Sequence, residues 1–221
     1  MAITEIYKEK KHPLYFSTTR TEIFPLLPDM FTTILELGCG NGSTLAALKS
    51  KNPSLKTVGI DINNENLNHL HKMGIDDVLI GNIETIEMPY PPESFDVILC
   101  LDVLEHLADP WSTIDRLAPL LKTNGTLIAS IPNVQNIRAL VPLVFGRWDY
   151  TDCGILDKGH LRFFTKRSAI QLINRSGLKV SKTLEITEPH WLPRIANALT
   201  LNFLKRLVTV QFLISATKGQ A

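Results

Sequence analysis

The sequence Ile-Leu-Glu-Leu-Gly-Cys-Gly-Asn-Gly, residues 34–42, decides the fold. An apolar run that favours a buried strand leads into three glycines at alternate positions, Gly38, Gly40 and Gly42, and a helix-favouring run, Ser43 to Lys51, follows at once. Glycine tolerates positive φ and has no Cβ to hold a ligand away. The helix N-terminus adds unpaired N–H groups and a partial positive charge. The stretch therefore predicts a strand–turn–helix unit with a ligand above the turn.

The details of the turn decide between classes of ligand. A dinucleotide fingerprint needs Gly-x-Gly-x-x-Gly, and its third glycine would fall on Ser43, which disfavours a nucleotide-dependent oxidoreductase. A phosphate-binding P-loop fails because no Gly-Lys-Ser/Thr is present. A second apolar run, Thr57 to Ile60, ends in Asp61. An acid at the tip of the second strand can accept both ribose hydroxyls of an adenosine lying across the first turn.

These motifs resemble those of the class I S-adenosylmethionine-dependent methyltransferases. The resemblance rests on Glu-Leu-Gly-Cys-Gly-Asn-Gly at 36–42, Gly-Ile-Asp at 59–61, Phe-Asp-Val-Ile at 95–98 and Val-Leu-Glu-His-Leu at 103–107. It implies S-adenosyl-L-methionine as the cofactor. It also implies that the cofactor is bound by residues at the tips of the first four strands: Glu36, Gly38, Cys39, Gly40, Asp61, Ile62, Asn82, Ile83, Leu101 and His106.

Two further parts of the cofactor site follow from the same resemblance. Related enzymes have a polar residue at the position of Asn82, often Asp, which contacts the adenine amino group while the next residue, Ile83, stacks on the ring. An amide oxygen can still accept from that amine. Tyr15 and Arg20 correspond to a lead-in that reaches the methionine carboxylate. The alternative for this pair is an aromatic staple on the sheet edge with a solvated arginine.

The order of the expected elements gives the fold class. Strands alternate with helical segments of about ten residues, which predicts an α/β fold with a parallel, doubly wound sheet. The resemblance adds that the sheet is Rossmann-like and seven-stranded, with helices on both faces and strand seven antiparallel between strands five and six. We expect the last three strands at 126–130, after an Asn124-Gly125 turn, at 180–186 and at 211–217.

A chain of 221 residues fits one domain with a substantial core. We expect residues 1–221 to form a single methyltransferase domain, with a lead-in at 1–33 and a lid-like insertion at 134–160 that covers the substrate. We expect residues 189–210 to form an apolar helical insertion before the last strand. Its apolar stripe with flanking cations suits peripheral contact with a membrane or packing on the sheet or on a second subunit, and the oligomeric state stays open.

The acceptor is indicated by His-Leu-Arg-Phe-Phe-Thr at 160–165. This segment resembles methyltransferases of bacterial surface-polysaccharide clusters and, less closely, the ubiquinone O-methyltransferase type. A small-molecule or glycan acceptor, methylated on a hydroxyl, is implied. A hydroxyl needs a base, and His160 and His106 are the histidines that the motifs place near the site. The alternatives are that His160 and Arg162 hold the lid and that His106 orients its loop.

Composition excludes other classes. The net charge of +1 offers no field for a nucleic acid. Three cysteines without a C-x-x-C pair predict reduced thiols in a cytoplasmic protein, and no signal peptide or spanning segment is expected. No His/Asp/Cys cluster has metal-ligand spacing along the chain, so no metal is predicted. The main rival function is a non-catalytic S-adenosylmethionine-binding sensor or scaffold, which would keep Gly38–Gly42 and Asp61 but need no base.

Overall fold

The structure of the protein is a computed structural model that describes residues 19–64, 67–187 and 205–219. Tyr15, most of the lead-in 1–33 and residues 189–204 of the expected apolar insertion lie outside the described residues. Within the described part of the chain, no helix has the length and hydropathy of a membrane-spanning segment.

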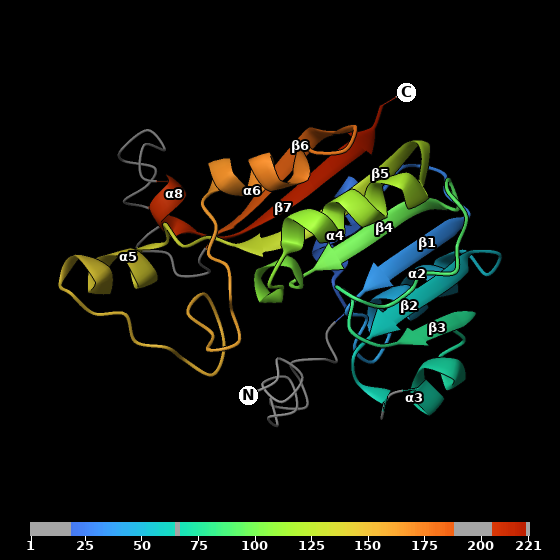
Figure 1. Ribbon diagram of the computed structural model, residues 1–221, viewed down its shortest axis with the longest axis horizontal. Coiled ribbons are helices and arrows are strands. Elements are labelled where there is room, and N and C mark those ends of the chain that lie inside the picture. The colour runs from blue at the N-terminus through green and yellow to red at the C-terminus, as the bar shows by residue number, and fades with distance from the viewer. Residues whose placement is uncertain (1–18, 65–66, 188–204, 220–221) are drawn as a thin grey trace.

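The described residues form one seven-stranded sheet, in the order β3-β2-β1-β4-β5-β7-β6 (Figure 1). Neighbouring strands from β3 to β5 pair in parallel, whereas β7 pairs antiparallel with both β5 and β6. This confirms the expected doubly wound sheet with an antiparallel seventh strand between five and six. The strands are β1 (Thr33–Leu37), β2 (Lys56–Asp61), β3 (Asp77–Ile80), β4 (Phe95–Leu101), β5 (Leu121–Pro132), β6 (Leu178–Thr187) and β7 (Thr209–Lys218).

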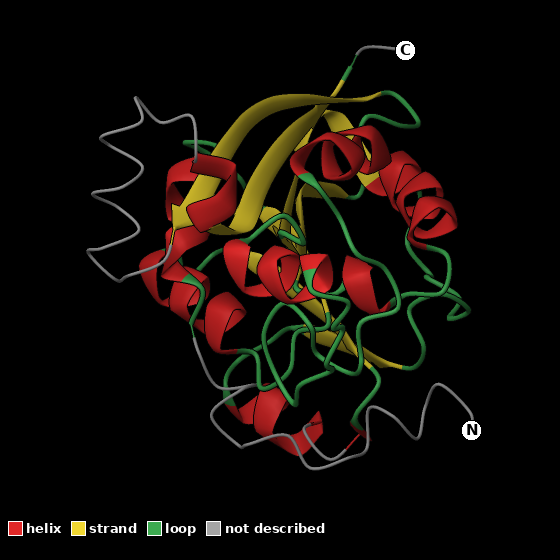
Figure 2. Cartoon of the chain, turned by 90° about the vertical axis from the view of Figure 1, so that its left-hand side faces the viewer, coloured by secondary structure: helices red, strands yellow, loops and turns green. Residues whose placement is uncertain are grey.

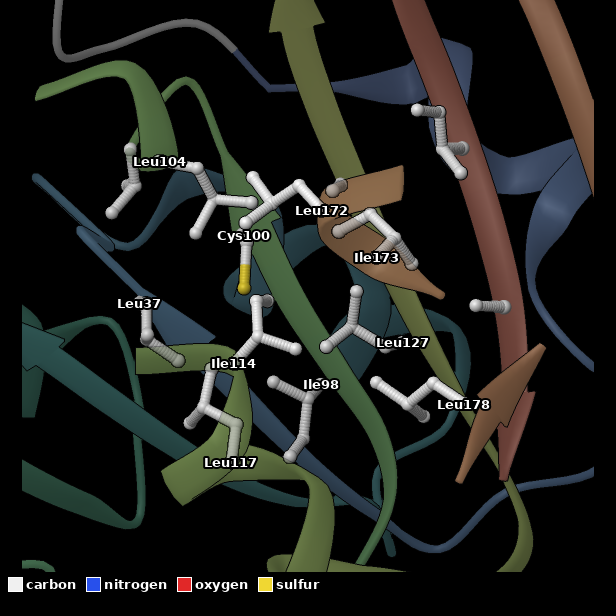
Figure 3. Close-up of a cluster of buried hydrophobic side chains, with 14 of the residues drawn as sticks. Leu37, Ile98, Cys100, Leu104, Ile114, Leu117, Leu127, Leu172, Ile173 and Leu178 are labelled. Atoms are coloured by element: carbon white, nitrogen blue, oxygen red, sulfur yellow. The ribbon is translucent and has the colours of Figure 1, made fainter. Parts of the chain in front are cut away.

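Helices cover both faces of the sheet (Figure 2). One core cluster packs α4 (Pro110–Leu117) and α6 (Lys166–Ile173) on the strands, and Figure 3 shows Ile114, Leu117 and Leu172 converging on Ile98 and Leu127. A second cluster packs the other face. Its helices are η2 (Thr21–Leu26), α2 (Ser43–Lys51) and α3 (Leu67–Lys72). The remaining helices are η4 (Leu104–His106), η5 (Ala118–Leu120), α5 (Ile137–Val144) and α8 (Lys205–Val208).

The topology fixes where a ligand binds. From β1 the chain adds β2 and β3 on one side, and then returns to add β4 and β5 on the other side. The strand order therefore reverses between β1 and β4, and doubly wound folds bind their ligands at the carboxyl ends of the strands at such a reversal. The glycines of residues 38–42 and the loop after Leu101 both lie at this edge.

Strand β5 differs from the expectation. It begins at Leu121 and runs through Asn124 and Gly125, where a turn was expected. Asn124 has a φ of 64°, and a Cβ on Gly125 would lie 2.8 Å from the backbone oxygen of Lys122. The pairing of β4 with β5 shifts register at this point. The Asn-Gly pair therefore forms a bulge within the strand. A left-handed residue followed by glycine can occur in a β-bulge as well as in a turn.

The first expected insertion, residues 134–160, follows directly after β5. Helix α5 follows β5 and extends beyond the sheet (Figure 1). Its C-terminal end carries exposed apolar side chains, including Val144 and Phe145. Thr209 and Val210, assigned to the helical insertion 189–210, instead begin strand β7.

Candidate functional site

The glycine turn, residues 38–42, is built from backbone that only glycine adopts without strain. Gly38, Gly40 and Gly42 have φ values of 64°, 54° and 75°. A Cβ on Gly38 would lie 2.5 Å from Cγ2 of Val103, so the turn sits directly against the loop after β4. The N–H groups of Gly38 and Cys39 donate to the carbonyl of Ile60, which ties the turn to β2. Gly42 then caps α2 at its N-terminus.

Asp61 closes the turn from the tip of β2. Its carboxylate accepts from the N–H of Gly40 at 2.7 Å and from the N–H of Asn63 at 2.8 Å. Burial raises the pKa of Asp61, and the backbone N–H groups of Asn63, Gly40 and Ile62 act against that rise. A carboxylate offers about four acceptor positions. The two short bonds from Gly40 and Asn63 therefore leave acceptor capacity toward the ribose that the sequence predicts here, and Ile62 beside Asp61 is half-buried.

Glu36 lies beneath the turn in β1 and is buried. Its Oε2 atom makes no hydrogen bond to the described residues. Burial raises the pKa of Glu36 from 4.5 to about 8, with the charge of Arg20 lowering it and the charge of Asp61 raising it. An unsatisfied buried carboxyl oxygen is costly, and a cationic or hydrogen-bonding ligand group would satisfy it.

Arg20 belongs to a polar network that the sequence analysis did not predict. Its guanidinium pairs with Glu22 and with Asp102, the residue after β4, and donates to Oγ of Ser130 at 3.2 Å. Ser130 Oγ donates to Asp102 Oδ1 at 2.8 Å, and the amide of Gln211 donates to the same oxygen. Arg20 is thus a paired, largely buried side chain, so the solvated alternative is wrong. An acid directly after the last apolar residue of β4 was the signal that could have identified Asp102.

The turn after β3 carries the residues expected near adenine. The side-chain oxygen of Asn82 accepts from the N–H of Glu84 at 2.9 Å, which closes a local turn. Ile83 is buried and joins the core. Arg116 of α4 donates to the carbonyls of Ile83 and Glu84 at 2.9 and 2.6 Å, so the turn is held from below. Part of the acceptor capacity of Asn82 is therefore used locally.

The two candidate histidines meet in a buried cluster, here called the histidine cluster: Glu105, His106 and His160. The imidazole rings of His106 and His160 pack edge to face with their centroids 4.7 Å apart. Nδ1 of His106 lies 2.9 Å from the carbonyl of Gly159, and Nδ1 of His160 lies 3.1 Å from that of Ile155. Because a carbonyl only accepts, each Nδ1 carries a proton, and Nε2 holds the lone pair of the neutral ring.

Glu105 completes the histidine cluster. Its carboxyl is buried, and neither oxygen makes a hydrogen bond to the described residues, although Oε1 lies 3.9 Å from Nε2 of His160. Burial, together with the charge of Asp102, raises the pKa of Glu105 well above its usual range. Its backbone carbonyl accepts from the N–H groups of Leu161 and Arg162 at 2.8 and 2.9 Å. These bonds fasten the loop after β4 to the segment that carries His160.

The structure brings most of the predicted residues together. Residues of the glycine turn contact β2, and Val103 packs against Gly38, which places the loop from Leu101 to His106 beside the turn. Cys39 and Leu101 are buried within this edge. Glu105 was not predicted as a site residue, although it lies within the motif at 103–107. Asn133, which follows β5, is fully buried, and its amide donates to the carbonyls of Arg206 and Thr209.

The residues at this edge fit S-adenosylmethionine. The cofactor presents ribose hydroxyls as donors and two positive groups, an ammonium and a sulfonium. Asp61 has acceptor capacity for the former, and the unpartnered oxygen of Glu36 is suited to a positive group. The glycine turn has no side chains to obstruct the approach. The acceptor groups of Asp61 and Glu36 therefore match the donors and positive groups of the cofactor.

Comparisons with known proteins agree with this geometry. A family model described as a methyltransferase domain matches residues 9–183. The chain is 33% identical over 99 residues to the 27-O-demethylrifamycin SV methyltransferase of Amycolatopsis mediterranei (strain S699), a match that covers 42% of this chain and 36% of that protein. It is 24% identical over 159 residues to the ubiquinone biosynthesis O-methyltransferase of Azoarcus sp. (strain BH72), and the match covers 66% of each protein. The chain thus spans about a third to two thirds of these curated relatives.

Solved structures show the same fold. A SAM dependent methyltransferase from Archaeoglobus fulgidus superposes with a TM-score of 0.69 and 17% sequence identity, over 97% of each chain. At this identity the likeness concerns the architecture: the mostly parallel seven-stranded sheet with helices on both faces.

Proposed function

The chain belongs to the methyltransferase-domain family, and we propose that it methylates a hydroxyl of a small molecule or a glycan. Family and fold imply S-adenosylmethionine as the methyl donor. The observation that carries the proposal is the juxtaposition of two sites at one sheet edge. The glycine turn with Asp61 is suited to the cofactor, and the histidine cluster stands beside it, linked through Val103 and the loop that follows β4.

The protein's part in the reaction is mostly alignment. S-adenosylmethionine supplies, when bound, a methyl group already activated by its sulfonium. Asp61 and the glycine turn would hold the nucleoside, and the unpartnered carboxyl oxygen of Glu36 would be available to a positive group of the cofactor. Holding donor and acceptor in line replaces a bimolecular encounter and is the largest contribution that binding makes to such a displacement.

We assign removal of the proton from the acceptor hydroxyl to His160. The carbonyl of Ile155 fixes the proton on Nδ1, so Nε2 is the basic nitrogen. An imidazole with a pKa near neutrality takes a proton efficiently as the methyl group arrives. The same bond to Ile155 would also support the alternative, in which His160 holds the 155–160 turn. His106, whose Nδ1 faces Gly159, orients the opposite side of the cluster.

The choice of oxygen as the acceptor atom rests on the relatives. The Azoarcus protein is named an O-methyltransferase, and the Amycolatopsis protein is named for a 27-O-demethylrifamycin substrate. The preference for a glycan rests on the resemblance at residues 160–165, with a quinone precursor as the next candidate. The balanced charge of +1 supports a neutral or small acceptor rather than a nucleic acid.

The test is a turnover assay of the full chain with S-adenosylmethionine and a panel of acceptors. The panel contains lipid-linked and nucleotide-linked sugars, catechol-type quinone precursors and matched amines. We expect S-adenosylhomocysteine to form in step with a methyl ether on one hydroxyl acceptor. Methylation of amines alone would overturn the O-methylation proposal. Tight cofactor binding without turnover on any acceptor of the panel would favour the non-catalytic sensor.

A further inference from the structure

The histidine cluster contains an unexplained buried acid. Glu105 is 1% exposed, and both of its carboxyl oxygens lack a hydrogen-bond partner among the described residues. A buried carboxylate without partners costs several kcal/mol, so such groups are normally neutralised, paired or bound to a metal. The methyl transfer outlined above does not use this carboxyl. Its presence beside two buried histidines therefore requires a separate explanation.

The charges around Glu105 favour a cation. Asp102 and Asp157 both act on it with the same sign of charge, and Arg20 is the cation that acts against them. Arg20 already pairs with Asp102 and Glu22. Of the three charged side chains named here as acting on Glu105, two are carboxyl groups and one is a cation, so the carboxyl groups are in excess. A divalent ion would offset that excess.

The histidines are oriented as metal ligands are. Histidines that bind metals almost always donate their second ring N–H to a carbonyl or a carboxylate, which fixes the tautomer and turns the other nitrogen to the ion. Nδ1 of His106 and Nδ1 of His160 each face a backbone carbonyl, of Gly159 and Ile155. Both rings therefore have the second contact that this arrangement requires.

The distances permit a shared ion. One ligand atom from each of Glu105, His106 and His160 lies within 4.8 Å of the others, and Nε2 of His160 is 3.9 Å from Oε1 of Glu105. Zinc bonds of about 2.0–2.2 Å place tetrahedral ligand atoms roughly 3.3–3.5 Å apart. Small rotations of three side chains would close the difference. The backbone bonds from Leu161 and Arg162 to the carbonyl of Glu105 keep the two contributing segments together.

We propose that Glu105, His106 and His160 bind one divalent transition-metal ion, with Zn²⁺ the best match to the ligand set. Two imidazoles and one carboxylate suit zinc and similar ions better than Mg²⁺, which prefers an all-oxygen shell. Three protein ligands leave a coordination position open, as in catalytic zinc sites. This site was not predicted from the sequence because its ligands have no metal-ligand spacing along the chain: Glu105 and His106 are adjacent, and His160 lies in a distant loop.

A bound ion would change how the acceptor is activated, and this consequence alone rests on the proposed function. A hydroxyl at the open position would lose its proton to solvent more readily, since a metal lowers the pKa of bound oxygen. Its oxygen would then attack the methyl carbon, while the carbon–sulfur bond breaks and its electron pair stays on sulfur. His160 acts as a ligand in that state and not as the base.

The test measures metal binding directly. The full chain is stripped with a chelator and dialysed against Zn²⁺ or against Co²⁺, whose visible absorption reports nitrogen and oxygen ligands. Metal content, the Co²⁺ spectrum and thermal unfolding are recorded for the wild type, Glu105→Gln, His160→Ala and the control His71→Ala. His71 is exposed on α3, outside the cluster.

We expect one equivalent of metal and a raised unfolding temperature in the wild type and in His71→Ala. Affinity should fall at least tenfold in Glu105→Gln and in His160→Ala. A stripped wild type that retains no Zn²⁺ or Co²⁺ overturns the proposal, as does equal binding by all four proteins. Folding is checked by circular dichroism, and the wild-type result decides even if a variant fails to fold. Metal binding without turnover would leave the site intact and count against the proposed function.

Discussion

The glycine turn and the histidine cluster lie at the same sheet edge but are organised in opposite ways. In the glycine turn the polar groups belong to neighbouring strand tips, and backbone N–H groups already satisfy the carboxylate of Asp61 in part. In the histidine cluster the histidines are fixed by backbone carbonyls, whereas the carboxyl of Glu105 is left without a hydrogen-bond partner among the described residues. The carboxylate of the first region is thus already oriented for a ligand. The carboxyl of the second region still lacks a partner, which an acceptor molecule or an ion could supply.

The largest effect that distinguishes the two regions should come from His160→Ala. Loss of a general base lowers turnover by roughly 10²–10⁴, and loss of a metal ligand would reduce it similarly. The kcat for the acceptor found in the panel is measured from S-adenosylhomocysteine release between pH 6 and pH 8. His71→Ala is the control. Full turnover by His160→Ala across that range would reduce His160 to a residue that supports the lid.

A stability comparison tests the glycine turn. Gly38 and Gly74 both have positive φ, at 64° and 80°, but only Gly38 has a neighbour where a Cβ would stand. Gly74→Ala should cost about 1–2 kcal/mol of unfolding free energy for the left-handed conformation alone. Gly38→Ala should cost more, because its Cβ also overlaps Val103. Urea unfolding measures both. Equal losses would show that the contact between Gly38 and Val103 relaxes freely.

The sequence predicted the glycine turn well because its signals are local. The alternate glycines, the helix from Ser43 and the acid after the second apolar run are all continuous features, and the structure contains each of them. The histidine cluster could be predicted only in part. His106 and His160 were selected by motif, but their ring contact depends on how a loop after β4 meets a distant segment.

The pairing of Arg20 with Asp102 was missed for the same reason. Arg20 and Asp102 are separated by 82 positions, and no periodicity along the chain links them. Strand β5 begins at Leu121, five residues before the expected start at 126. The Asn124-Gly125 pair was read as a turn, but such a pair also occurs in a bulge within a strand. The residues alone do not distinguish a turn from a bulge at Asn124-Gly125, because the result depends on how β5 pairs with β4.

The pH dependence of stability offers a smaller effect. The pKa of Glu36 is raised from 4.5 to about 8, so the folded state holds a proton that the unfolded state releases. Stability contributed by the protonated carboxyl is therefore lost as pH rises through this window. Glu36→Gln cannot ionise and should show a weaker decline between pH 5 and pH 8 in thermal unfolding. If the unfolding temperatures of the wild type and Glu36→Gln fall in parallel with pH, Glu36 is not the buried, unpartnered acid described here.

The central claim, that the two regions are separable, is tested most directly by calorimetric titration of S-adenosylmethionine into the wild type, Asp61→Ala and His160→Ala. Charge-assisted bonds from two hydroxyls to a carboxylate are worth about 1.5–3 kcal/mol each. We therefore predict at least tenfold weaker binding in Asp61→Ala, with its fold retained, and nearly unchanged binding in His160→Ala. Unchanged affinity in Asp61→Ala, or equal losses in the two variants, would contradict the account.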